Sequence, residues 1–206
     1  MIKIKINGKE YEMPQSWDEI TMKQYCHLFY NLPKASLEAS EGDRIRETLK
    51  NEGIIISRLL GENDDFVLGL PVKMFSILQQ HAMFIYSIDN FLNSGAFTIK
   101  IDGRRYEMTD VDKMSLRQYI DSDMIMKEEG ENQFIELLAC LLTPVDGGYD
   151  GRYEELIPKI ENMKASEGLP FIYTFFKKKE LSKKLSEACS KVEDVADQLV
   201  QHTQSS

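Results

Sequence analysis

Alternating apolar and charged residues open the chain. From Ile2 to Met13 the apolar residues fall at every second position of two short segments, with Lys and Glu between them and Asn7-Gly8 at the centre. Asn-Gly favours a two-residue type I′ turn, because both residues tolerate a positive φ. The pattern therefore predicts a β-hairpin with an apolar face, on which Ile4 pairs with Tyr11, and an outer face of paired opposite charges.

The same pattern returns in the second half of the chain. A hairpin pattern runs from Phe97 to Met108 around Asp102-Gly103, and it again places an apolar pair, Ile99 and Tyr106, on one face. When residues 4–25 are aligned with residues 99–119, about half of the positions are identical, which is far more than unrelated segments share. We interpret this as a tandem duplication.

The outer face of the second hairpin differs from that of the first. Lys100 is expected opposite Arg105, a mildly repulsive pair, where the first hairpin places Lys5 opposite Glu10. We interpret the change as a face that has acquired a different neighbour. Lys100 and Arg105 are therefore candidate partner-interface residues.

A helix start follows each hairpin. Residues Thr21 to Gln24 and Ser115 to Gln118 both fit the capping box, in which a hydroxyl and a Gln side chain satisfy backbone amides reciprocally. Tyr25 and Tyr119 come directly after these boxes, where a hydrophobic staple would hold them. We therefore predict that both tyrosines are core residues rather than site residues.

The remaining periodic segments predict further helices. In the first half these are Arg44–Leu60, with a weak point at Gly53, and Val72–Leu92 after Pro71. In the second half they are Gln133–Leu142, which Thr143-Pro144 should stop, and a helix near residues 153–164, followed by a break at residues 167–170.

These elements together predict an α+β protein that is mostly α-helical. It is a tandem duplication of a unit made of a β-hairpin followed by helices, with units at residues 1–95 and 96–182 and an extra C-terminal amphipathic helix at 183–206. Near this last segment the apolar residues alternate spacings of four and three, which is a heptad seam. These residues are Leu181, Leu185, Ala188, Val192, Val195 and Leu199. The seam would dock either on the protein's own body or on a partner, which makes Leu185, Val192 and Leu199 candidate interface residues.

Composition narrows the classes of function. The 206 residues are 42% hydrophobic with a net charge of −9, which is typical of a folded globular protein and argues against broad binding to nucleic acid or to an anionic membrane. No apolar run is long enough for a membrane span, and the amino terminus lacks the apolar stretch of a secretory signal. Three widely separated cysteines fit free thiols in a reducing compartment.

The residues that usually carry chemistry are scattered. Cys26 and His27 are adjacent and would point to different sides of a helix, and no histidine has metal-ligand spacing. The loop from Asp146 to Gly151 begins like a calcium loop, but Ile157 occupies the position that needs a bidentate Glu. We therefore predict no catalytic, cofactor-binding or metal-binding residue, and a protein that is not an enzyme.

Two other features suit a partner surface. Lys177 and Lys178, with further lysines nearby, form either a solvated helix face or a contact for an acidic protein. Trp17 precedes the first capping box, where it would act either as an interface anchor or as a plug over its own helix. An alternative of another class is an enzyme or its regulatory subunit, with an acidic site drawn from Asp64-Asp65, Asp146 and Asp150.

The opening segment also resembles a known group of proteins. It reads Ile-Asn-Gly-Lys-x-Tyr from Ile6 to Tyr11 and then Trp-x-x-Ile-Thr-Met-x-x-Tyr from Trp17 to Tyr25. This is similar to the amino-terminal pattern of small proteins from the structural gene clusters of tailed bacteriophages, including crAss-like phages. Tail-assembly chaperones and small head–tail or tail components are the families concerned, and their motif carries no catalytic residue.

This resemblance implies a non-catalytic role in a phage particle. The expected function is that of a structural virion component of the neck or tail ring, or of the connector, that binds other phage structural proteins as a homo-oligomeric ring or a stable hetero-complex. It would occur in the host cytoplasm during assembly and then in the virion. A transient tail-assembly chaperone is the alternative.

Overall fold

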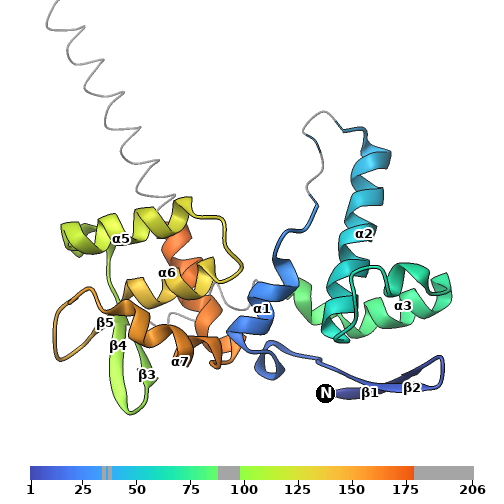
Figure 1. Cartoon of the computed structure of the whole chain (residues 1–206), viewed down its shortest axis with the longest axis horizontal. Helices are drawn as coiled ribbons and strands as arrows, with labels where there is room; N and C mark the ends of the chain where they lie inside the picture. Colours follow the sequence, from blue (N-terminus) through green and yellow to red (C-terminus); the bar gives the residue numbers. More distant parts are fainter. Residues whose placement is uncertain (34–35, 37–38, 88–97, 179–206) are drawn as a thin grey trace, which may run out of the picture.

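The chain folds as a mixed α+β protein with two small antiparallel sheets. The computed structural model describes residues 1–33, 36, 39–87 and 98–178. In Figure 1, helix α1 (Met22–Phe29) lies between two groups of elements. Elements from residues 98–178 lie to its left, and the first hairpin and residues 41–87 lie to its right. Among the described residues, no helix combines the length and the apolar character that crossing a membrane requires.

The first hairpin has the predicted register. Strands β1 (Ile2–Ile6) and β2 (Lys9–Met13) pair antiparallel, with Ile4 opposite Tyr11. Asn7 and Gly8 have φ values of 49° and 86°, as a type I′ turn requires. The apolar face of this ribbon joins the core, so the prediction of a half-buried hairpin is confirmed.

The second hairpin gains a strand that the sequence did not indicate. Strands β3 (Thr98–Ile101) and β4 (Arg104–Met108) pair as predicted, but β5 (Leu142–Pro144) adds to the outer edge of β4. Thr143-Pro144 was expected only to stop a helix. It also pairs with Glu107, because the edge of β4 offers free backbone groups there. Phe97, expected opposite Met108, lies outside the described residues.

Both helix starts form, but only one capping box is complete. After the 3-10 turn η1 (Trp17–Glu19), Thr21 and Gln24 cap α1 reciprocally. After the 3-10 turn η4 (Val111–Lys113), Ser115 accepts a hydrogen bond from the Gln118 amide at the start of α5 (Leu116–Lys127). The Gln118 side chain instead donates to the Cys140 carbonyl, so the second box is only half formed.

The rest of the first half is helical, but the helix predicted from Val72 is shorter than expected. Helix α2 (Glu41–Leu59) is followed by the 3-10 turn η2 (Val67–Gly69), helix α3 (Val72–His81) and the 3-10 turn η3 (Met83–Tyr86). The single helix predicted from Val72 onward therefore breaks at Ala82, which is buried among core residues.

The break predicted at residues 167–170 is wrong. After α6 (Gln133–Leu141), the 3-10 turn η5 (Tyr153–Leu156) and α7 (Ile157–Glu161), the chain turns at residues 162–164 and forms a continuous helix over 165–178. Gly168 is retained in that helix because Met22 of α1 packs directly against it. The break has moved to the turn, where Lys164 forms a β-bridge with Thr21.

The two halves share one hydrophobic core. The Met22 amide donates to the Met163 carbonyl at 2.8 Å, and the Ala165 amide donates to the Ile20 carbonyl at 2.7 Å. A single cluster of buried side chains includes residues from both sides of the unit boundary expected near residue 95. The expected units 1–95 and 96–182 therefore pack as one body, and the segment 183–206 lies outside the described residues.

Candidate protein interaction surface

Helix α5 presents its apolar side chains outward. Its core-facing side carries two polar residues, Gln118 and Ser122, together with Ile125. The outer side carries four large apolar residues with exposed fractions of 75%, 54%, 48% and 57%, and we call these four the α5 face. They are Leu116, Tyr119, Ile120 and Met124. Their spacing places them on one side of a helix, so they form a continuous apolar stripe.

Polar anchors hold α5 in this orientation. The Gln118 side-chain amide donates to the Cys140 carbonyl at 2.8 Å and to the Thr109 hydroxyl at 3.1 Å. Cys140 lies in the last turn of α6, where carbonyl groups lose their helical partners, so the Gln118 amide satisfies a group that would otherwise be buried without a donor. Ser122 is also buried on this side, but its hydroxyl donates within α5, to the Tyr119 carbonyl at 2.9 Å, so on this side the anchor to the rest of the chain is Gln118.

A second polar link joins α5 to the loop after β5. The Tyr149 hydroxyl donates to Asp121 Oδ2 at 2.6 Å and lies 3.6 Å from Cys140 Sγ. Burial raises the pKa of Tyr149, and the hydrogen bond to Asp121 raises it further. Burial also raises the pKa of the Cys140 thiol to about 11. A neutral thiol and phenol fit a structural role, because nucleophilic cysteines need a lowered pKa.

The matching helix in the first half buries the same positions. Relative to the helix caps, Met22, Tyr25 and Cys26 of α1 correspond to Leu116, Tyr119 and Ile120 of α5. All three α1 residues are buried.

Elements of the second half cover this side of α1. The Tyr25 hydroxyl lies 3.4 Å from that of Tyr173, and the Tyr25 ring meets Phe134 edge-on at 6.2 Å. Beside this contact, Lys23 Nζ forms an ion pair with Glu161 Oε2 at 3.2 Å. The prediction that both capping-box tyrosines are core residues is thus confirmed for Tyr25 and wrong for Tyr119.

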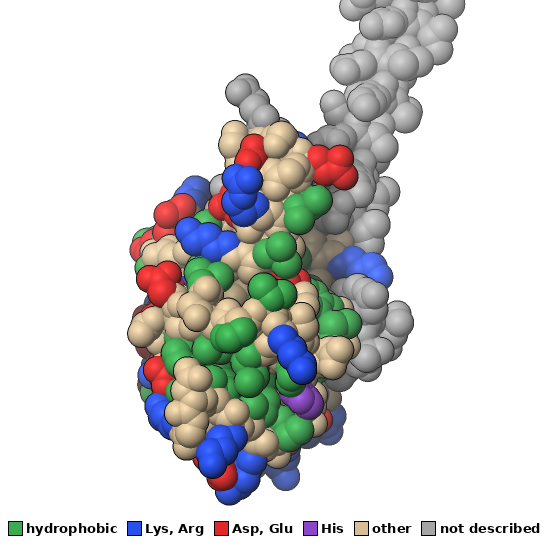
Figure 2. All heavy atoms as spheres, turned by 90° about the vertical axis from the view of Figure 1, so that its right-hand side faces the viewer, with side chains coloured by type: hydrophobic (Ala, Val, Ile, Leu, Met, Phe, Trp, Pro, Cys, Tyr) green, Lys and Arg blue, Asp and Glu red, His purple; other side chains and the backbone are tan. Residues whose placement is uncertain are grey.

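A second set of exposed apolar residues lies on the opposite side of the molecule. It comprises Leu68, Val72, Ile77, Met83 and Tyr86, which belong to η2, α3 and η3. Figure 2 views the molecule from this side and shows hydrophobic side chains gathered among polar ones. In Figure 1, α5 lies to the left of α1 and α3 lies to its right, so the two apolar surfaces lie on different sides of α1.

The residues predicted as partner contacts do not gather on one surface. Trp17 is 5% exposed and packs edge-on against Tyr25 and Phe84, so it is a plug in the core and offers no surface to a partner. Lys100 and Arg105 face each other on the exposed side of the second hairpin, as predicted.

The two candidate lysines at the end of the last described helix differ in their surroundings. Lys177 is exposed, whereas Lys178 forms an ion pair with Asp110, whose pKa is lowered by that hydrogen bond. The other predicted contacts lie outside the described residues; they are Leu185, Val192 and Leu199.

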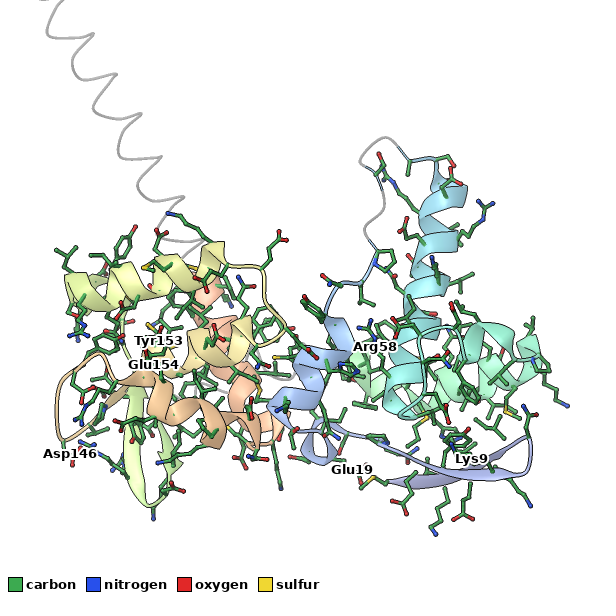
Figure 3. All side chains as sticks on the ribbon, viewed as in Figure 1. Lys9, Glu19, Arg58, Asp146, Tyr153 and Glu154 are labelled. Atoms are coloured by element: carbon green, nitrogen blue, oxygen red, sulfur yellow. The ribbon has the colours of Figure 1, made fainter. Side chains whose placement is uncertain are left out.

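The acidic residues proposed for an alternative enzymatic site are separated. Asp64 binds Arg58 through two bonds of 2.7 Å, whereas Asp146 binds Arg104 at 3.0 Å. Figure 3 shows Arg58 beside α1 and Asp146 in the loop at the far left. Each hydrogen bond lowers the pKa of its carboxyl group, which is the opposite of what a cluster of acids would do.

Asp150 is also paired with an arginine, and the candidate pair of Cys26 and His27 does not form a site. Asp150 accepts from the Arg152 amide and side chain, and these bonds lower its pKa. His27 contacts Glu131 on the surface, whereas Cys26 is buried, so the two point apart as expected. Within the described ranges, no group of three or more His, Cys, Asp or Glu side chains is arranged to hold a metal ion.

The α5 face is the feature that sequence reasoning missed. Leu116, Ile120 and Met124 recur every fourth residue, which signals an apolar stripe, but the pattern does not say which side of the helix packs inward.

Comparison of the chain with models of protein families, with curated proteins and with solved structures gives no match.

Proposed function

We propose that this chain is a non-catalytic protein-interaction component of a tailed bacteriophage that assembles into a ring at the neck or tail. The exposed α5 face carries the proposal. Covering four large apolar side chains that are between about half and three-quarters exposed would contribute roughly 1 kcal/mol apiece, or about 4 kcal/mol together. A surface of this kind is typical of a partner contact.

The arrangement of the halves supports a repeated assembly unit. Residues 2–29 and 98–127 follow the same order of hairpin, 3-10 turn and capped helix, which fits our interpretation of a tandem duplication. The first hairpin also lacks the third strand that covers the second one among the described residues, so the edge of β2 could accept a strand from a neighbour.

Light scattering coupled to size exclusion tests the proposal over a range of protein concentrations. We expect a closed oligomer of this chain, or a stable complex when the chain is co-expressed with the products of neighbouring genes. A strict monomer that binds none of these products would contradict the proposal.

The abundance of the chain in purified particles tests its place in the virion. Quantitative mass spectrometry should find it at a fixed ratio to other virion proteins, after its assembly in the host cytoplasm. Its absence from particles would instead favour a transient tail-assembly chaperone.

A further inference from the structure

We propose that the α5 face of one copy docks on the first half of a second copy, over residues 77–86. This inference rests on the proposed function, because it assigns the surface through which the copies would join. It follows from a contact that the chain already makes within itself.

The internal contact between α1 and residues 163–173 is the template. Met22 packs closely against Gly168. A Cβ added at Gly168 would lie only 2.6 Å from the Met22 sulfur atom. Tyr25 meets Tyr173 through their hydroxyl groups at 3.4 Å. Helix α1, with its capping box, thus docks its Met22 and Tyr25 side onto the segment that follows Pro158.

Helix α5 carries the same positions, and no element among the described residues covers them. Leu116, Tyr119 and Ile120 take the places of Met22, Tyr25 and Cys26, and they keep a large apolar or aromatic character. Because Gln118 anchors α5 from the opposite side, the helix cannot turn this stripe inward without breaking the bond to the Cys140 carbonyl. The stripe is therefore built into the folded chain and is available to another molecule.

The first half contains the counterpart of the internal acceptor. Leu70-Pro71 matches Ile157-Pro158, and the aromatic segment at residues 84–87 matches the one at 171–174 with the same spacing. By this alignment Ile77 and Tyr86 occupy the places of Lys164 and Tyr173. Both are exposed, with fractions of 39% and 52%.

The backbone at the two acceptors differs, which changes the kind of contact. Residues 164–173 begin with a β-bridge and continue as a helix, whereas residues 77–86 form the end of α3 and the 3-10 turn η3. A docked copy would therefore use side-chain contacts, with Tyr119 of one copy meeting Tyr86 of the next, and no backbone bridge.

The positions of the two surfaces select a second copy as the occupant. Helix α5 lies to the left of α1 and α3 lies to its right, so the folded chain does not bring the α5 face onto residues 77–86 of the same copy (Figure 1). Two different surfaces on one chain join copies head to tail, and such contacts produce a ring when the rotation closes.

The test uses two variants that each remove one side of the contact. The donor variant carries Ile120→Glu and Met124→Glu, and the acceptor variant carries Ile77→Glu and Met83→Glu; all four positions are exposed. The matched control carries Lys5→Gln and Lys50→Gln, which change the net charge by the same amount at exposed positions on neither surface. Circular dichroism and urea unfolding establish that every variant folds.

Light scattering then gives the outcome. We expect the wild type and the control to form the same oligomer, and each single-sided variant to associate at least about thirtyfold more weakly, since a buried apolar anchor contributes 2 kcal/mol or more. An equimolar mixture of donor and acceptor variants should form a discrete heterodimer, because one intact donor and one intact acceptor remain.

Other occupants of the α5 face give different results, and each would overturn the inference. An acceptor variant that assembles like the wild type would indicate that α5 pairs with α5 or with another protein. A monomer whose α5 amides lose hydrogen-exchange protection when Leu185→Glu and Val192→Glu are introduced in the full chain would indicate that the C-terminal segment covers the face. A monomer that binds a neighbouring gene product would refute this inference alone, whereas a monomer without a partner would refute the proposed function as well.

Discussion

The joint between the two halves can be tested by adding a single methyl group at Gly168. A Cβ at this position would lie 2.6 Å from Met22 Sδ, 2.9 Å from Met22 Cγ and 3.3 Å from Leu138 Cδ2. Met22 and Leu138 are both fully buried, so neither side chain has free space to move into. The substitution Gly168→Ala therefore forces α1 away from the helix over residues 165–178.

Two opposing effects set the magnitude. In a helix interior, Ala is more favourable than Gly by about 1 kcal/mol, which alone would stabilise the protein. Overpacking a core by one methyl group costs about 1–3 kcal/mol. Because the contacts fall below 3.0 Å on two atoms of a buried side chain, we expect the steric term to win and Gly168→Ala to lower the free energy of unfolding by about 1–2 kcal/mol.

Urea unfolding monitored by circular dichroism measures this change, with Gly42→Ala as the matched control. Gly42 is exposed in α2, and the nearest atom to an added Cβ is Ser40 Oγ at 3.9 Å. The control should stabilise the protein by up to about 1 kcal/mol. Combining Gly168→Ala with Met22→Ala should cost about 1 kcal/mol less than the sum of the single changes, because the new methyl group fills space that Met22 leaves.

A Gly168→Ala variant as stable as the Gly42→Ala control would refute this reasoning. It would mean that Met22 moves aside at no cost and that α1 is loosely held against the second half. The internal contact would then be a poor template for docking between copies.

Three further predictions concern buried charge, pH and thiols. Arg58, whose side chain is 10% exposed, binds Asp64 and three carbonyl groups at the end of α1, so Arg58→Ala should destabilise the protein by about 3 kcal/mol in urea unfolding. Arg46→Ala, which removes an exposed ion pair, should change stability by less than about 0.5 kcal/mol; equal effects would contradict the role of Arg58. The Arg58 hydrogen bond lowers the pKa of Asp64, so this stabilisation is complete above the unfolded pKa of about 3.9 and is lost as the pH falls through the folded pKa. The difference in urea midpoint between the wild type and Asp64→Asn should accordingly shrink as the pH falls, and a constant difference would refute the assignment. Burial raises the pKa of Cys26 to about 12 and that of Cys140 to about 11, so mass spectrometry should find neither alkylated by iodoacetamide in the native protein at neutral pH. Labelling at the rate of a free cysteine would show that these thiols are accessible.

Local signals predicted the elements that depend on neighbouring residues alone. The turns at Asn7-Gly8 and Asp102-Gly103 and the hairpin registers follow from φ preferences and from the alternation of apolar residues. The N-caps at Thr21 and Ser115 also form as predicted, because each hydroxyl reaches a backbone amide within its own first turn.

Elements that depend on distant partners were not predictable in the same way. The strand at residues 142–144 forms because the edge of β4 lies beside the end of α6. The helix over residues 165–178 continues through Gly168 and Pro170, since tertiary packing outweighs the weak local preference to break there.

The orientation of α5 shows most clearly what tertiary structure decided. The amino-acid sequence determined that Leu116, Tyr119, Ile120 and Met124 share one side of a helix, because side-chain positions follow from the helical repeat. Whether that side faces the core depends on the partners of the other side, and Gln118 finds one in the Cys140 carbonyl of α6. Turning the apolar side inward would remove the donor from the Cys140 carbonyl, at a cost of about 1–3 kcal/mol, and would expose Ile125, which the fold now buries. The partners of the Gln118 side, which only the tertiary structure supplies, therefore decided which side of the helix faces outward.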